Sequence, residues 1–434
     1  MEIFVVNVFL YVVLFLWALR NKKDCSAFYI FSGLMYAVVA CMGVYIFNEN
    51  IYQNEIPDHR GLEYLSYTPF FLMFVMMLVV FWPLKTIPKF ELEWSDRRVN
   101  WFSNIAVLLI VSHMFFWLYG FQLDAASDLG DAYHMSVSGD LALQYSSDGE
   151  VIISKILRRL SLCITPIFFY LQFYRFSKSA KIGAAVVYLC IGIFASVVPA
   201  ILQGSRGSLF FTLFSLIYVY TVFKDEIPLK TKKKLYGLFA VVIVTMSFYV
   251  VVISVMRSKG DSEGAIIKIF RYFGEPFLNL GLVYWNSTDV HTYGIRYFPK
   301  LLELYGGFEL PESKYGVDAL REFWTKIYGV NMYYFKTFFG DLYMEFGVVG
   351  AFTVSTLTAT GAWLSKKLKN PLLCHFILYY YAKNVVIWGI FGFGVTQNVC
   401  VDLAYALVFW YIFSKFWNPV KKEEDGEKEE KKSG

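Results

Sequence analysis

The chain has 434 residues, of which 57% are hydrophobic, 20% aromatic and only 17% charged. Soluble domains average about 45–50% apolar and about 25% charged residues, and a soluble core of this length could not bury so much apolar surface. The net charge of +5 is small and gives no sign of a nucleic-acid partner. We therefore expect an all-α integral membrane protein whose solvent is the lipid bilayer.

Eleven apolar segments are candidates for membrane-spanning helices, which need about 20 mostly apolar residues to cross the hydrocarbon layer. The fifth segment is short, and we expect its helix to begin earlier, near Ile152. The first has no basic region before it and no cleavage site after it, so we interpret it as a span rather than a signal peptide. The expected spans are 3–19, 26–47, 65–83, 101–120, 160–174, 182–203, 208–223, 237–256, 346–364, 371–389 and 397–414.

Basic residues gather in the short connections on one side of these spans, which the positive-inside rule assigns to the cytoplasm. The N-terminus is then outside and the C-terminus inside. We expect one transmembrane domain, residues 1–418, followed by a disordered, charged cytoplasmic tail, residues 419–434. The connections concerned contain Arg20, Lys22, Lys23, Lys85, Lys89, Arg97, Arg98, Arg175, Lys178, Lys181, Lys224, Lys230, Lys232, Lys233, Lys234, Lys366, Lys367 and Lys369.

Two long connections fall on the outer side, from about Phe121 to Ser154 and over residues 257–345 between spans eight and nine. A connection of the second length is usually functional. Its apolar residues recur at helical spacing, which predicts short, partly interfacial helices. The residues that carry this spacing are Ile266, Ile267, Phe270, Phe273, Phe277, Ala319, Phe323 and Ile327.

A tight turn, Gly204-Ser205-Arg206-Gly207, joins spans six and seven at the outer surface. Its arginine must lie at or just above membrane depth, where an unpaired charge is costly and often functional. A planar, permanently charged guanidinium suits a phosphate or diphosphate. The alternative is an interfacial anchor that extends its charge towards water.

The large outer connection contributes further charged candidates. Arg257 opens it, and Arg271 and Glu275 follow four residues apart, on one face of the expected helix. The last two either form an i,i+4 ion pair, or Arg271 joins the other arginines in a cationic patch. Arg296 and His291 are additional candidates on the same connection.

Two pairs of charged residues lie at the later spans. Asp341 and Glu345 are four apart at the outer mouth of span nine, where one of them acts as a general base or both balance the arginines as counter-ions. Lys383 in span ten and Asp402 in span eleven should lie at similar depth, either as a mutual ion pair or as part of a binding site.

Several signatures are missing from the sequence. It has no phosphate-binding Walker loop, zinc motif or Ser-His-Asp arrangement, and no acidic cluster typical of a metal-dependent sugar-nucleotide site. The six cysteines lie in or beside apolar runs without zinc-type spacing. We expect no metal and no cofactor.

Three features together resemble the bacterial oligosaccharide repeat-unit polymerases, the Wzy-type O-antigen polymerases. They are the Gly204–Gly207 turn, the large outer connection that opens near Arg257, and the sequence Asp341-x-x-x-Glu345-Phe-Gly347-x-x-Gly350. The layout of about eleven spans extends the resemblance over the whole chain. Paired arginine-to-glycine spacings in two outer loops, which some members have, are not clear in this sequence.

The resemblance implies a metal-independent glycosyltransferase of the bacterial cytoplasmic membrane, with its active site facing the periplasm or the exterior. It implies transfer of a growing glycan from polyprenyl diphosphate to the terminal sugar of a carrier-linked repeat unit, with a chain-length regulator as a further partner. Fixed cations would stabilise the leaving diphosphate. The expected catalytic residues are Arg206, Arg271 and Glu345, and the expected substrate-binding residues are Arg257, Tyr272, Glu275, His291, Arg296, Asp341 and Lys383.

Three other functions fit the same sequence, and one of them is a structural or scaffold protein of polysaccharide export. An O-antigen ligase would use the same donor and transfer the glycan to lipid A core. A lipid-linked oligosaccharide flippase or transporter would have charges along a central path and two related halves, and no internal repeat is evident.

Overall fold

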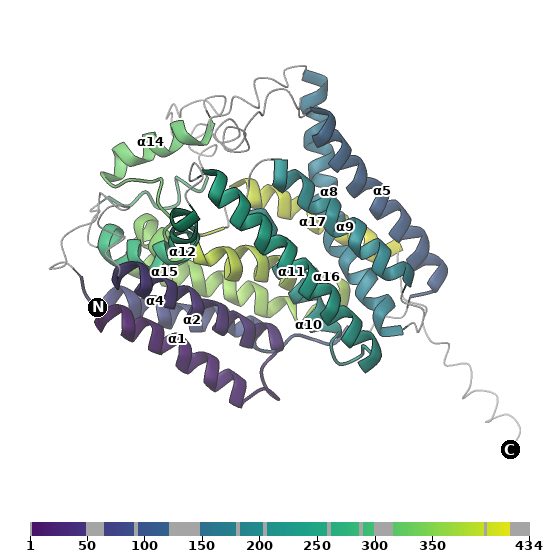
Figure 1. Cartoon of the computed structure of the whole chain (residues 1–434), viewed down its shortest axis with the longest axis horizontal. Coiled ribbons are helices and arrows are strands. Elements are labelled where there is room, and N and C mark those ends of the chain that lie inside the picture. Colours follow the sequence, from purple (N-terminus) through teal and green to yellow (C-terminus); the bar gives the residue numbers. More distant parts are fainter. Residues whose placement is uncertain are drawn as a thin grey trace, which may run out of the picture.

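The computed structural model of the chain describes residues 2–48, 65–90, 94–120, 148–178, 183–202, 206–257, 262–285, 290–298, 316–394 and 397–416. Within these ranges every regular element is a helix, which confirms the all-α class. The helices pack side by side in one bundle (Figure 1). The predicted charged tail, 419–434, and most of the connection between Phe121 and Ser154 lie outside the described residues.

Each of the eleven apolar segments coincides with a helix or a run of helices. The fifth begins at Asp148, in line with the expected early start. The bounds are α1 Glu2–Arg20, α2 Ala27–Asn48, α4 Thr68–Lys85, α5 Asp96–Gly120, α8 Asp148–Lys178, α9 Gly183–Leu202, α10 Arg206–Phe223, α11 Leu229–Arg257, α15 Phe338–Ser365, α16 Pro371–Tyr381 with η5 Ala382–Ile387 and η6 Trp388–Ile390, and α17 Gln397–Phe416.

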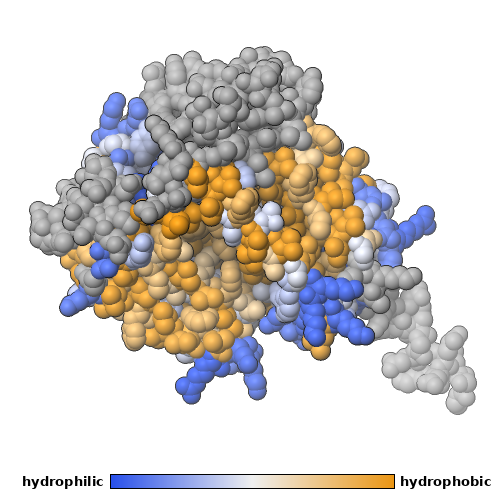
Figure 2. Space-filling view, viewed as in Figure 1, coloured by the Kyte–Doolittle hydropathy of each residue, from blue (hydrophilic) through white to orange (hydrophobic). Residues whose placement is uncertain are grey.

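The surface of this bundle is apolar. By length and composition, five described helices (α1, α2, α4, α11 and α15) are able to cross a membrane, and 183–198 and 209–223 are shorter apolar helices. Val244 and Phe248 of α11 are 67% and 69% exposed. Figure 2 shows an orange hydrophobic band across the bundle, with blue hydrophilic residues gathered at its lower edge. Such surfaces require a lipid environment, so the chain is a membrane protein.

Two amphipathic helices occupy the long connection 257–345, as the apolar spacing predicts. They are α12, Ser262–Asn279, continued by the π-helix η3, Leu280–Tyr284, and α14, Gly316–Tyr328. On α14 the buried Trp324 and Tyr328 are four residues apart, and the exposed Glu322 and Lys326 form the opposite face. On α14 one face therefore packs on the protein and the other is polar.

Two glycines let α12 cross α2 at backbone contact. A Cβ atom on Gly274 would lie 2.6 Å from the amide nitrogen of Gly43, closer than real Cβ atoms approach other atoms. Small residues permit this close helix packing in membranes. The crossing fixes the position of α12, and with it the positions of Arg271 and Glu275 on either side of Gly274.

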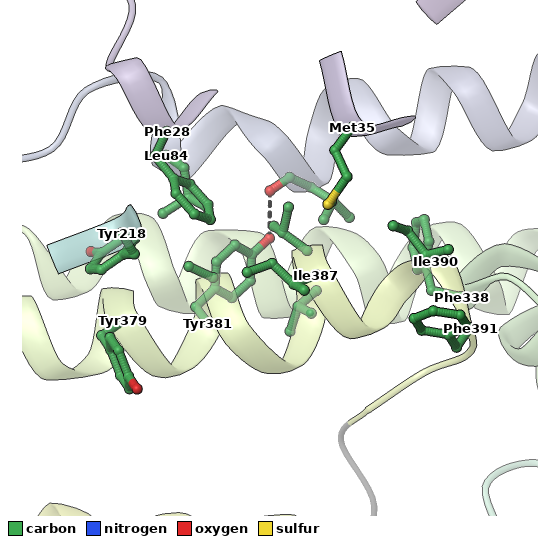
Figure 3. Packing of buried hydrophobic residues seen from close by; sticks show 14 of the residues in the cluster. Phe28, Met35, Leu84, Tyr218, Phe338, Tyr379, Tyr381, Ile387, Ile390 and Phe391 are labelled. Atoms are coloured by element: carbon green, nitrogen blue, oxygen red, sulfur yellow. Dashed lines mark hydrogen bonds between the residues drawn. The ribbon is translucent and has the colours of Figure 1, made fainter. Parts of the chain in front are cut away.

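The core between α2, α4 and α16 is rich in aromatic residues whose hydroxyl groups bond to backbone carbonyls. Tyr36 donates to the carbonyl of Val386 at 2.8 Å, inside the irregular helix η5, and Tyr381 donates to that of Val80 at 2.7 Å. Backbone groups at membrane depth need such partners. Figure 3 shows Tyr381 pointing into this core and Tyr379 pointing to the opposite side of the same helix.

Candidate functional site

Arg296 lies between two carboxylates at the start of α15. Its Nη2 is 2.6 Å from Oδ1 of Asp341, and its Nε is 2.8 Å from Oε1 of Glu345. Burial acts to lower the pKa of Arg296, but the two carboxylates raise it well above its ordinary value. The guanidinium is therefore a permanent cation held by charge-assisted hydrogen bonds.

Glu345 is fully buried, and each of its carboxylate oxygens accepts two hydrogen bonds. Besides Arg296, its donors are the hydroxyl of Thr292 and the amide of Gly294, both at 2.8 Å, and the hydroxyl of Tyr328 at 2.5 Å. These donors come from the 290–298 segment and from α14. Glu345 thus ties both to α15, which corresponds to the counter-ion alternative rather than the general-base one.

The two carboxylates align because α15 begins earlier than the expected residue 346. Thr337 caps the helix by accepting the amide of Gly340 at 3.1 Å. Asp341 and Glu345 then lie one turn apart on the same face. Capping therefore carries the helix beyond the apolar run that predicts span nine. The second oxygen of Asp341 accepts the amide of Phe393 at 2.9 Å.

Gly347 interrupts α15 just after Glu345. Its φ of 66° and ψ of −176° are essentially restricted to glycine, and the helix resumes beyond it. A Cβ atom there would lie 3.3 Å from Nε2 of His291. The glycine therefore both bends the helix and leaves room in front of the imidazole.

The backbone of α15 also defines the state of the imidazole ring. Nδ1 of His291 is 2.9 Å from the carbonyl oxygen of Met344, which can only accept, so Nδ1 carries the proton. In the neutral ring Nε2 is then the acceptor. A half-buried imidazole with Nδ1 anchored and Nε2 left as the acceptor beside Gly347 has the hydrogen-bonding state of a general base.

Lys336 lies beside this cluster, one residue before the helix cap. It is 6% exposed, and its ammonium is 3.5 Å from two carbonyl oxygens, those of Met332 and Tyr334. Burial lowers the pKa of Lys336 to about 7, and the nearby Asp341 only partly opposes this. Lys336 was not among the residues predicted from the sequence.

A second charged group lies on α12. Nε of Arg271 is 2.9 Å from Oε2 of Glu275, as the i,i+4 alternative predicts. Asn279 donates to the other oxygen at 3.0 Å and to the carbonyl of Phe335 at 2.9 Å. Burial raises the pKa of Glu275, and Arg271 opposes the rise. Tyr272 packs between the rings of neighbouring aromatics at about 5 Å.

The remaining candidates are further from this cluster or outside the described part of the chain. The side chains of Arg206, at the first residue of α10, and Arg257, at the last of α11, are not described. Lys383 and Asp402 line one cavity of about 350 Å³ among α8, α10 and α17, which agrees with their expected similar depth. Asp402 lies 3.6 Å from Arg159 and also interacts electrostatically with Lys383, so the mutual ion pair stays a prediction.

Four residues of the cluster were missed by reasoning from the sequence. Thr292, Gly294 and Tyr328 bond to Glu345 from positions far along the chain, so no local spacing relates them to it. Lys336 had a signal, because it is a single charge within an aromatic run that starts at Tyr333.

Comparisons with protein-family models, with curated proteins and with solved structures find no match. In the described ranges no group of three His, Cys, Asp or Glu residues has a geometry that could hold a metal ion. The functional conclusion therefore depends on the site itself and on the sequence resemblance.

Proposed function

We propose that the chain is a membrane glycosyltransferase that extends a glycan carried on polyprenyl diphosphate at the outer face of a bacterial cytoplasmic membrane. In this proposal the chain crosses the membrane eleven times, with its N-terminus outside and its C-terminus in the cytoplasm. The product is a surface polysaccharide, as in the Wzy-type polymerases that the sequence resembles.

The observation that carries the proposal is the anchored His291 imidazole in front of Gly347. Glycosyl transfer to a sugar hydroxyl needs a base within reach of that hydroxyl and space for two sugars. The Arg296 cluster holds the segment that bears the imidazole, and a glycine at 347 keeps a side chain from pressing on Nε2. The amphipathic helix α14 lies beside this position, because Tyr328 bonds to Glu345 and to Thr292.

The reaction needs no group beyond the two lipid-linked substrates. The acceptor hydroxyl attacks the anomeric carbon of the donor glycan and loses its proton to Nε2 of His291. The bond from that carbon to the diphosphate oxygen breaks, and polyprenyl diphosphate leaves with the electron pair. Arg206, Arg257 and Arg271 are the proposed cations that stabilise the charge on the leaving oxygen. Asp341 and Glu345 position Arg296 rather than react.

The test is glycan extension by the purified protein in vesicles supplied with polyprenyl-diphosphate-linked repeat units. His291→Asn keeps a donor for the Met344 carbonyl and removes the Nε2 acceptor. We expect a loss of about 100-fold or more in kcat, the usual contribution of a general base. Tyr293→Phe, two residues along and 74% exposed, is the control and should retain activity. Full activity in His291→Asn would contradict the proposed base.

The topology has its own test, in a variant without the six native cysteines. Tyr293→Cys and Lys369→Cys place single thiols on opposite sides of span nine. An impermeant maleimide should label the first in intact cells and the second only after the membrane is opened. The reverse pattern would show that the orientation is opposite to the proposed one. Labelling of both cysteines from outside would show that the segment between them does not cross the membrane.

A second candidate function, transport of a lipid-linked oligosaccharide, is favoured by one observation. The cavity lined by Lys383 and Asp402 places charged side chains inside the bundle. A fluorescent lipid-linked oligosaccharide in vesicles distinguishes the two, because a transporter moves it across the bilayer without lengthening it. Product found on lipid A core instead of the carrier would indicate the ligase alternative.

A further inference from the structure

Three lysines from three separate connections meet at the end of the bundle opposite the His291 site. Lys23 follows α1, Lys85 ends α4 and Lys366 follows α15, and all three line one cavity of about 440 Å³. Ser26 ties the connections together, because its amide and its hydroxyl donate to the carbonyls of Lys85 and Leu84, each at 2.6 Å. The arrangement is therefore built into the fold.

These lysines have no ion-pair partner among the described residues, although the Lys85 ammonium lies 5.3 and 5.1 Å from the ring centres of Trp17 and Trp82. Asp24 is the one acidic residue in the lining, and no carboxylate lies within 4.0 Å of any of the three ammonium groups in the described part of the chain. Lys366 bonds to the hydroxyl of Thr86 at 3.2 Å. Burial lowers the pKa of Lys366, which an anion in the cavity would reverse.

An apolar groove continues from this cavity along the membrane-facing surface. It has a volume of about 420 Å³, lies between α4 and α15, and shares Trp82 and Trp363 with the lysine cavity. The two tryptophans are 57% and 40% exposed, so both are open to lipid. Beyond them the groove is lined by Leu78 on one helix and Ala359 on the other.

We propose that this composite site binds one anionic phospholipid, with its phosphate among Lys23, Lys85 and Lys366 and one acyl chain in the groove past Trp82 and Trp363. Charge complementarity selects an anionic headgroup, since basic pockets between helices at one membrane surface suit anionic lipids. Indole rings sit naturally at headgroup level, where these two lie between the charged and apolar parts. The site is separate from the proposed reaction and does not depend on it.

The headgroup test uses the purified, delipidated full chain in detergent and two lipids with identical chains, dioleoyl phosphatidylglycerol and dioleoyl phosphatidylcholine. We expect preferential binding of the phosphatidylglycerol. Replacing Lys23, Lys85 and Lys366 together by Gln should weaken its apparent Kd by about 100-fold, at roughly fivefold for each lysine near an anionic surface. The control replaces Lys22, Lys89 and Lys369, one from each of the same three connections, and should change Kd less than about threefold.

The acyl-chain test keeps every lysine. Thr360→Trp fills the groove and should weaken phosphatidylglycerol binding about tenfold, whereas Leu357→Trp, on the same helix but outside the groove, should not. Equal binding of the two lipids, equal losses in the two triple variants, or full displacement by millimolar inorganic phosphate would each overturn the proposal. Stronger protection by polyprenyl phosphate than by phosphatidylglycerol would overturn it as well.

Discussion

The two ends of α15 treat charge in opposite ways. At the Asp341 end, a buried arginine is held by two carboxylates at 2.6 and 2.8 Å, and the chain neutralises its own cation. At the Lys366 end, three lysines share a cavity with one aspartate, and no described carboxylate reaches them. Charge balanced within the chain holds segments together, whereas unbalanced charge is available to a ligand. The same helix thus supports a structural cluster at one end and an open site at the other.

The largest expected effect breaks the balanced cluster. Arg296→Met leaves two buried carboxylates without their cation and should lower the free energy of unfolding by about 3–5 kcal/mol. Unfolding in mixed micelles by SDS titration measures it. Adding Asp341→Asn and Glu345→Gln removes the stranded charges and should restore most of the loss. If Arg296→Met alone were as stable as the wild type, the cluster would not hold the 290–298 segment.

The next effect concerns the backbone beside the cluster. Gly347→Ala puts a methyl group where φ is 66° and Nε2 of His291 is 3.3 Å away, so we expect a loss of about 1–3 kcal/mol and of glycan extension. Gly361→Ala, in the same helix with no atom within 4 Å of the added Cβ, is the control and should be neutral or stabilising by up to about 1 kcal/mol. Equal stability of the two variants would contradict the assigned conformation.

Lys336 lies beside the Arg296 cluster without a carboxylate partner among the described residues, and it should make the free energy of unfolding depend on pH. Its pKa falls to about 7 on folding, so between pH 7 and its ordinary value of 10.5 the unfolded chain binds a proton that the folded chain does not. Stability should therefore rise with pH in this window, with a slope approaching about 1.4 kcal/mol per pH unit. Lys336→Met should remove this rise, and Lys326→Met, on the exposed face of α14, should leave it. Unfolding at pH 7 and 9.5 measures both.

The smallest effect is expected at the open end. Lys366→Gln removes a charge that has no carboxylate partner among the described residues, so in lipid-free detergent it should change stability by no more than about 0.5 kcal/mol. The same unfolding titration measures this change. Wild type with added phosphatidylglycerol shows, for comparison, the stability of the lipid-bound protein. A loss above about 2 kcal/mol in the absence of lipid would mean that the lysine is balanced by the protein after all.

The helices of the bundle could be predicted from the sequence because hydrocarbon thickness fixes how long an apolar run must be. The amphipathic α12 and α14 were predictable for a similar reason, since one packed face imposes a period of 3.6 residues. The start of α15 was not, because a cap at Thr337 rather than hydropathy determines it. The number of crossings stays a prediction.

The site was only partly predictable. Local spacing related Arg271 to Glu275 and Asp341 to Glu345, since residues four apart share a helix face. It could not relate Glu345 to Arg296, because that contact depends on how a distant segment folds back onto α15. Arg206, the first of the expected catalytic residues, and Arg257 have side chains outside the described residues, so their roles stay predictions.

The backbone contact between Gly43 and Gly274 has a consequence for biogenesis. The ribosome delivers α2 to the membrane long before α12. The surface of α2 around Gly43 therefore lacks its contact with Gly274 while the intervening helices are inserted. Any nascent chain that stops after α11 lacks this helix contact. Such a chain would be an incompletely packed intermediate that quality-control proteases recognise. Docking of α12 on α2 would then be the step that completes the packing of the inserted helices.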